Sequence, residues 1–73
     1  MSFKDNLYYF RTKHGMTQSE LASKCGVTQQ AIHSYEVGVR SPNAETIKVL
    51  AASLECTAND LVYGPDAVKE ATT

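Results

Sequence analysis

Two adjacent glutamines, Gln29 and Gln30, carry the side chains of this sequence with the clearest recognition chemistry. A side-chain amide offers a donor and an acceptor together, and that pair matches N6 and N7 of adenine in the major groove of DNA. His33 and Ser34 would extend the same polar face by one helical turn. Exposed glutamine is commonplace and a lone surface histidine is more often inert. Taken alone, these four residues are therefore better explained as a solvated helix face.

Other kinds of chemistry find little support in the residue types. Cys25 and Cys56 lie far apart, without a CxxC pair or a nearby pair of histidines, so their spacing predicts no zinc site and no disulfide framework. The sequence has no Ser/His/Asp set and no phosphate-binding loop, and a chain this short does not readily enclose a pocket of roughly 300–1,000 Å³. We expect no enzyme activity, no metal and no cofactor, and we interpret both cysteines as small buried hydrophobes.

Size and composition predict one soluble, folded domain. A chain of 73 residues forms one hydrophobic core at most, and 42% hydrophobic with 21% charged residues is ordinary for a globular protein. No stretch approaches the roughly 20 apolar residues that cross a bilayer, and the first residues lack a basic region followed by an apolar one. This pattern predicts a cytoplasmic location.

The net charge of −1 is an objection to DNA binding, because affinity for DNA depends largely on cations that neutralise phosphates. The charges are unevenly distributed, however. Residues 1–56 hold six basic and five acidic side chains, and the acidity is concentrated in the C-terminal part. We therefore expect modest DNA affinity for one protomer and a need for two.

Two short helices with a tight turn between them are predicted in the first half of the sequence. Thr17 to Glu20 has the form of a capping box, which starts a helix that Gly26 ends. Thr28 then caps a helix that runs to about Glu36. Two helices joined by a glycine-containing turn of three to four residues are the sequence form of a helix-turn-helix, whose second helix can enter the major groove.

Three further helices complete the predicted set. Ser2 can cap a helix over residues 3–13, in which Phe3, Leu7 and Phe10 recur at helical spacing. Asn43 can cap a fourth helix, for which Ser41 with Pro42 is a competing start. Thr57 begins a short fifth helix that contains Leu61, and Gly64 with Pro65 ends the regular structure.

An ordered series of residues resembles the Cro/C1-type helix-turn-helix family, which includes lambdoid phage repressors and Cro proteins. The resemblance covers roughly residues 3–62 and implies an all-α, compact five-helix bundle, with the domain over residues 1–63 and a short C-terminal tail over residues 64–73. The matching residues are Thr17-Gln18-Ser19-Glu20-Leu21-Ala22, Gly26-Val27-Thr28, Ile32, Tyr35-Glu36, Gly38, Pro42, Leu50-Ala51 and Leu54.

The resemblance also implies roles for particular residues. Base edges would be contacted by Gln29 and Gln30, with His33 and Ser34 next along the groove, and phosphates by Gln18, Thr28 and Arg40. Arg11 of the first helix would form a structural ion pair with Glu36. Glu55 stands where glycine is common, so the end of the fourth helix is expected to differ from the family pattern.

The function implied is that of a sequence-specific regulator of transcription, most simply a repressor that binds a palindromic double-stranded operator as a homodimer. An antitoxin or another protein-interaction module on the same fold is the alternative. It would be favoured by a contiguous apolar patch of exposed residues, for which the candidates are Val37, Val39, Val49, Val62 and Tyr63. The region of the fourth and fifth helices and the tail are candidate dimer surfaces, whereas Tyr8 and Tyr9 are expected to be ordinary packing residues.

Overall fold

Five α-helices follow one another along the chain in the computed structural model, which describes residues 2–64. They are α1 (Phe3–Lys13), α2 (Gln18–Cys25), α3 (Gln29–Val37), α4 (Ala44–Ser53) and α5 (Ala58–Tyr63). No strand occurs among the described residues, so the all-α prediction is confirmed. The tail expected over residues 64–73 lies outside the described residues from position 65 onward.

Short polar side chains start four of the five helices. The side chains of Thr17, Thr28, Asn43 and Thr57 each accept a hydrogen bond from a backbone N–H in the first turn of the following helix. Each of these bonds satisfies a donor that has no partner within its own helix. Asn43 is therefore the start of α4, and the competing start at Ser41 with Pro42 is not used.

The first helix begins differently. Ser2 precedes α1, but its side chain makes no capping bond to the backbone. Its hydroxyl instead donates to the carboxylate of Asp5 over 2.9 Å. Ser2 is therefore the residue that precedes α1, as predicted, but its side chain does not cap the helix. The acidic side chain of Asp5 in the first turn complements the positive end of the helix.

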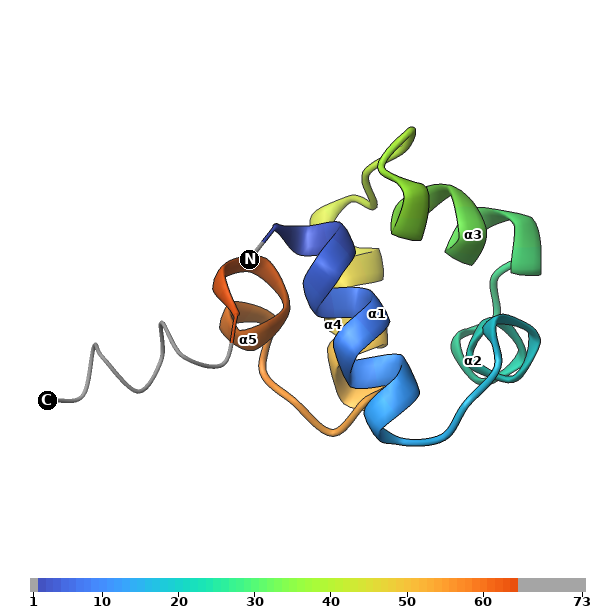
Figure 1. Ribbon diagram of the computed structural model, residues 1–73, viewed down its shortest axis with the longest axis horizontal. Coiled ribbons are helices and arrows are strands. Elements are labelled where there is room, and N and C mark those ends of the chain that lie inside the picture. Colours follow the sequence, from blue (N-terminus) through green and yellow to red (C-terminus); the bar gives the residue numbers. More distant parts are fainter. Residues whose placement is uncertain (1, 65–73) are drawn as a thin grey trace, which may run out of the picture.

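The core lies where the five helices meet. In Figure 1, α1 crosses in front of α4, with α5 on one side and with α2 and α3 on the other. Packing of α1 against α3 and α5, and of α2 against α3 and α4, joins the helices around one apolar cluster. Its buried members are Leu7, Phe10, Leu21, Ala22, Ala31, Ile32, Tyr35, Leu50, Ala51, Leu54 and Leu61.

One buried residue in α1 is polar. Asn6 is fully buried, and its Nδ2 donates to the backbone carbonyl of Leu61 over 2.8 Å. Its Oδ1 has no hydrogen-bond partner among the described residues. A buried amide that binds the backbone of another helix fixes α5 against α1, since the bond to Leu61 is lost if α5 moves away.

Two expectations about packing need correction. Tyr8 and Tyr9 are predicted to be ordinary packing residues beside the core of α1, yet they are 56% and 40% exposed. Both lie on the outer side of α1, where the Tyr9 ring packs edge-on against Phe10 with 5.0 Å between ring centroids. The two cysteines are half-buried rather than buried, and burial together with the nearby Asp60 raises the pKa of Cys56 to about 11.

Two further classes of feature are absent from residues 2–64. Among these residues, no helix has the length and apolar character needed to cross a membrane. Over the same range, no group of three or more His, Cys, Asp or Glu side chains is placed to hold a metal ion.

Candidate nucleic-acid interface

The third helix has one buried and one exposed face. Ala31, Ile32 and Tyr35 point into the core with at most 7% of their surface exposed. Gln29, Gln30 and His33 are exposed, and Ser34 is half-buried beside them. In Figure 1, α3 runs along the upper edge of the molecule, and no other helix covers its outer side. The four side chains that sequence reasoning assigns to base edges thus share one helix, with three of them open to solvent.

The turn between α2 and α3 sets the direction of that helix. Gly26 has φ +71°, a left-handed conformation that residues with a Cβ adopt at a cost, so glycine suits this position. Two residues later the Thr28 hydroxyl oxygen accepts a bond of 3.1 Å from the backbone N–H of Ala31. Thr28 is itself exposed, and it starts α3 directly beside Gln29.

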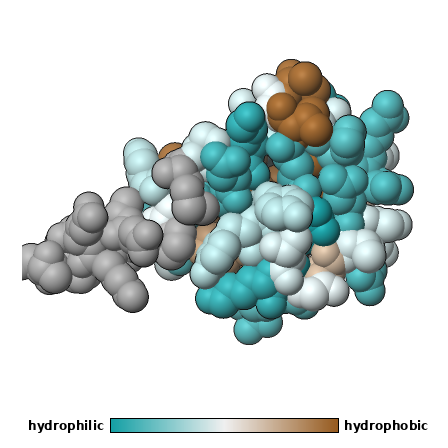
Figure 2. Space-filling model, in the orientation of Figure 1, coloured by the Kyte–Doolittle hydropathy of each residue, from teal (hydrophilic) through white to brown (hydrophobic). Residues whose placement is uncertain are grey.

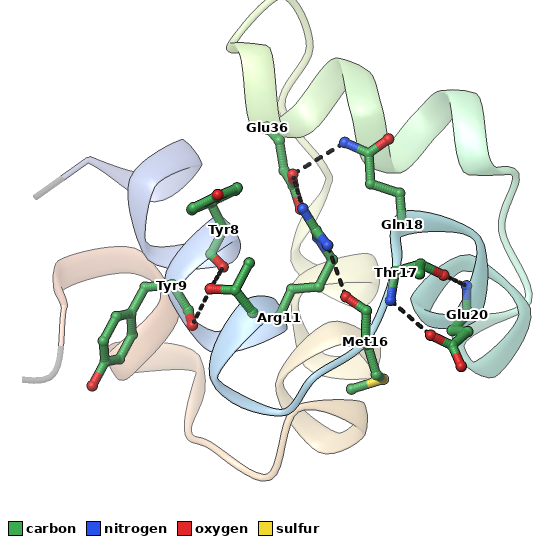
Figure 3. Close-up of polar contacts among 9 residues, drawn as sticks. Tyr8, Tyr9, Arg11, Met16, Thr17, Gln18, Glu20 and Glu36 are labelled. Carbon is green, nitrogen blue, oxygen red and sulfur yellow. Dashed lines mark hydrogen bonds and ion pairs between the residues drawn. The ribbon is translucent and has the colours of Figure 1, made fainter.

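An ion pair joins α1 to the end of α3. Arg11 Nε donates to Glu36 Oε2 over 2.5 Å, and Arg11 Nη2 donates to Glu36 Oε1 over 3.0 Å. The two side chains are only 11% and 5% exposed, so both charges depend on each other for compensation. Figure 3 shows the guanidinium of Arg11 reaching the carboxylate of Glu36, and this hydrogen-bonded carboxylate raises the pKa of Arg11 above its ordinary value.

The same pair also binds the start of α2. Gln18 Nε2 donates to Glu36 Oε1 over 3.1 Å, and Arg11 Nη1 donates to the backbone carbonyl of Met16 over 2.7 Å. Both contacts are drawn in Figure 3. Sequence reasoning assigned Gln18 to a phosphate and missed its bond to Glu36, because no local pattern links residues 18 positions apart. Glu36 therefore holds the orientation of α2 relative to α3 as well as that of α1.

The turn that follows α3 carries Arg40. This side chain is exposed, and its guanidinium carbon lies 5.7 Å from the centroid of the Tyr35 ring. Val37 and Val39 in the same segment are 48% and 73% exposed. In Figure 2 the most hydrophobic area of the visible face lies over the end of α3 and this turn, at the top of the view. Two exposed valines thus precede Arg40 in the chain.

The exposed apolar residues come from several elements. Val49 in α4 is 39% exposed and Tyr63 in α5 is 64% exposed, whereas Val62 is half-buried. Val49 and Tyr63 thus belong to α4 and α5, whereas Val37 is the last residue of α3 and Val39 lies in the turn after it.

A family model for helix-turn-helix proteins matches residues 7–61 of this chain. The transcriptional activator BcrR of Enterococcus faecalis is 32% identical over 73 residues, which cover all of this chain and 36% of that protein. The uncharacterised transcriptional regulator YqaE of Bacillus subtilis is 32% identical over 62 residues, which cover 85% of this chain and 53% of that protein. The chain thus spans between a third and just over a half of these relatives.

Among solved structures, the P22 c2 repressor in complex with a synthetic operator superposes with a TM-score of 0.83 at 26% identity. The match covers 88% of this chain and 97% of that one. The chain belongs to the Cro/C1-type helix-turn-helix family of DNA-binding transcription regulators. Members of this class are generally not enzymes. In this family α2 and α3 are the helix-turn-helix, and α3 is the recognition helix.

Proposed function

We propose that this chain represses transcription by binding a palindromic double-stranded operator, with α3 in the major groove and with Gln29 and Gln30 at base edges. Repression is the activity named for the P22 c2 protein, whose structure covers nearly the same residues. A regulator that acts on DNA would work in the cytoplasm of a bacterial or archaeal cell, the kind of organism in which the relatives occur.

The observation that carries this proposal is the open polar face at the start of α3. Gln29 and Gln30 occupy the first turn of the helix and are exposed, while the opposite face is anchored by the buried Ile32 and Tyr35. The first turn of a recognition helix is the part that reaches base edges. An amide there can pair with N6 and N7 of adenine, and His33 and Ser34 would lie next along the groove.

Contacts to the phosphates would hold this helix in register. Gln18 is the first residue of α2, where the helix N-terminus favours an anion, and the bond from Nε2 to Glu36 leaves the second amide hydrogen free to donate. The Thr28 hydroxyl accepts from Ala31 and retains its own hydrogen for a phosphate oxygen. Arg40 supplies a cation from the turn after α3.

Two copies of the chain would be needed for a specific site. One short recognition helix covers few base pairs, whereas a two-fold dimer places two such helices about 34 Å apart on successive half-sites. The exposed Val49 and Tyr63, with the half-buried Val62 between them in sequence, make the region of α4 and α5 the proposed dimer surface.

Selection of bound duplexes from a random pool tests the proposal. We expect enrichment of a palindromic sequence, and we expect Gln29→Ala and Gln30→Ala each to relax individual base positions by about 1–3 kcal/mol. Ser23→Ala, which changes an exposed residue near the opposite end of α2 from Gln18, is a matched control that should leave the enriched sequence unchanged. Enrichment of no sequence, or enrichment that is indifferent to both glutamines, would favour the interaction-module alternative.

A further inference from the structure

The backbone amides of the turn after α3 are already occupied. The N–H groups of Gly38, Val39 and Arg40 all lie within hydrogen-bond distance of one acceptor, the carbonyl oxygen of Ser34, at 3.1, 3.1 and 3.4 Å. Backbone N–H groups in such turns are common ligands for phosphate, but these three point back into the end of the helix. A phosphate that approaches residues 38–40 would therefore be bound by side chains, because their three N–H groups are already in use.

The side chain of Lys4 lies against this turn although it belongs to α1. A β-carbon built on Gly38 would lie 3.1 Å from Cδ of Lys4 and 4.0 Å from both its Cε and its Nζ. Gly38 has φ +87° and no side chain, so the lysine stem crosses it closely. The packing of α1 against α3 thus brings a cation from the start of the chain to the end of the recognition helix.

Lys4 and Arg40 have no acidic partner in the part of the chain that the structure describes. The ion pair between Arg11 and Glu36 is the one salt bridge found among residues 2–64. Lys4 is exposed and rests on Gly38, and Arg40 is exposed and rests on the Tyr35 ring. Both cations are therefore positioned by packing, and no described carboxylate forms a salt bridge with either of them.

We propose that Lys4 and Arg40 together form a phosphate-binding site for the DNA backbone at the C-terminal end of α3. The inference rests on the proposed function, because it takes the anion to be a phosphodiester of the duplex in which α3 lies. It adds a contact from α1 that neither the helix-turn-helix nor the residue pattern of the loop indicates. It also gives a partial answer to the objection from net charge, since one more cation faces the DNA.

A purely structural role for Lys4 makes a different prediction. The negative end of the α3 dipole lies at the same turn, so the ammonium could serve only to stabilise that helix end. In that case, loss of the charge would lower the free energy of unfolding and leave the salt dependence of DNA binding unchanged. The two roles are separated by measuring both quantities on the same variants.

The experiment measures DNA affinity from 50 to 200 mM salt, and the free energy of unfolding in urea, for the wild type and for Lys4→Gln, Lys4→Arg and Arg40→Gln. The probes are the duplex enriched by the wild type and a duplex of equal length and unrelated sequence. Each phosphate contact contributes about 0.9 to the slope of log affinity against log salt. We expect Lys4→Gln and Arg40→Gln each to make this negative slope about 0.9 less steep on both duplexes. The ratio of wild-type affinity to variant affinity should then fall about 3.5-fold from 50 to 200 mM salt.

Lys24→Gln is the matched control, because it removes the same charge from an exposed site at the far end of α2 from Gln18. Its slope should equal that of the wild type, and Lys4→Arg should restore the slope that Lys4→Gln loses. An unchanged slope for Lys4→Gln in a protein that still enriches a sequence would overturn this inference alone. A wild-type chain that binds neither duplex would overturn the proposed function and this site together.

Discussion

At the scale of single residues, the ion pair between Arg11 and Glu36 connects three helices of the candidate interface. It joins α1 to α3 directly, and the bonds to Gln18 and to the Met16 carbonyl connect it to the start of α2. A buried ion pair adds little net stability compared with apolar residues of similar volume, but breaking it leaves a charge without compensation. The role of the pair is therefore to hold orientation.

Substitution of one partner should cost far more than its share of a double substitution. We expect Arg11→Met and Glu36→Met each to lower the free energy of unfolding by about 3–5 kcal/mol, because each strands a buried charge. The double variant should lose less than the sum of the two. Urea unfolding of all four proteins measures this coupling, and losses that simply add would contradict the account.

The backbone of Glu55 is the second prediction at this scale. Glu55 lies two residues after the end of α4 at Ser53, has φ +55°, and is the one described residue other than glycine with a positive φ. A left-handed residue with a Cβ costs roughly 1–2 kcal/mol. Glu55→Gly should therefore raise the unfolding free energy by about 1 kcal/mol, which corresponds to about 4–8 °C in Tm.

The control for this prediction lies three residues earlier in the chain. Ala52 is exposed within α4, where glycine is unfavourable, so Ala52→Gly should lower the free energy of unfolding by about 1 kcal/mol. Thermal unfolding of both variants distinguishes the two positions. A fall in Tm for Glu55→Gly would show that the left-handed backbone carries no penalty.

At the scale of helices, the capping box of α2 predicts a particular pH dependence. The backbone N–H of Thr17 donates to Glu20 Oε1 over 2.8 Å, and this bond, with a smaller contribution from the Thr17 side chain, lowers the pKa of Glu20 below 4.5. A carboxylate with a depressed pKa in the folded state stabilises the protein above its unfolded pKa, and that stabilisation is lost as the pH falls through the folded value.

The measurement compares the wild type with Glu20→Gln in urea from pH 7 to pH 3. The wild type should be the more stable protein at pH 7, and the difference should shrink as the pH falls below about 4.5, the unfolded value. Thr17→Ala removes the other half of the box and should reduce the same pH dependence. A difference in stability that does not change with pH would contradict this role for Glu20.

Local signals account for how well the helices could be predicted. The capping residues Thr17, Thr28 and Thr57 act on backbone groups within three positions, so their effect is visible in the sequence itself. The two faces of α3 follow from helical periodicity in the same way. The predicted end of α3 at about Glu36 differs from the observed end at Val37 by one residue.

Contacts between distant residues account for what could not be predicted. Asn6 has the type of a capping or surface residue, and only the packing of α1 on α5 buries it against Leu61, 55 positions away. Tyr8 and Tyr9 lie between the buried Leu7 and Phe10 in sequence but are exposed. Successive residues of a helix are rotated by about 100°, so residues 8, 9 and 10 cannot all lie on the apolar face of α1. The bond from Gln18 to Glu36 depends equally on tertiary packing.

At the scale of the whole molecule, the proposed dimer is open to direct test. We expect sedimentation to detect association of the chain, and we expect Tyr63→Glu to weaken it at least about tenfold, since a charge would enter an apolar contact. Val39→Glu places the same charge on an exposed apolar residue of another element and should leave association of the free protein unchanged. Only monomer, both free and on the enriched duplex, would contradict the dimer.

The most direct measurement replaces adenines of the enriched duplex one at a time by 7-deaza-adenine, which removes N7 from the major groove. If the amides of Gln29 and Gln30 pair with adenine, at least one replacement should weaken binding by the wild type by about 1–3 kcal/mol. The same replacement should then have no further effect on the matching Gln29→Ala or Gln30→Ala variant. Replacements that never affect the wild type, or that weaken the variants just as much, would contradict reading of the major groove by these two residues.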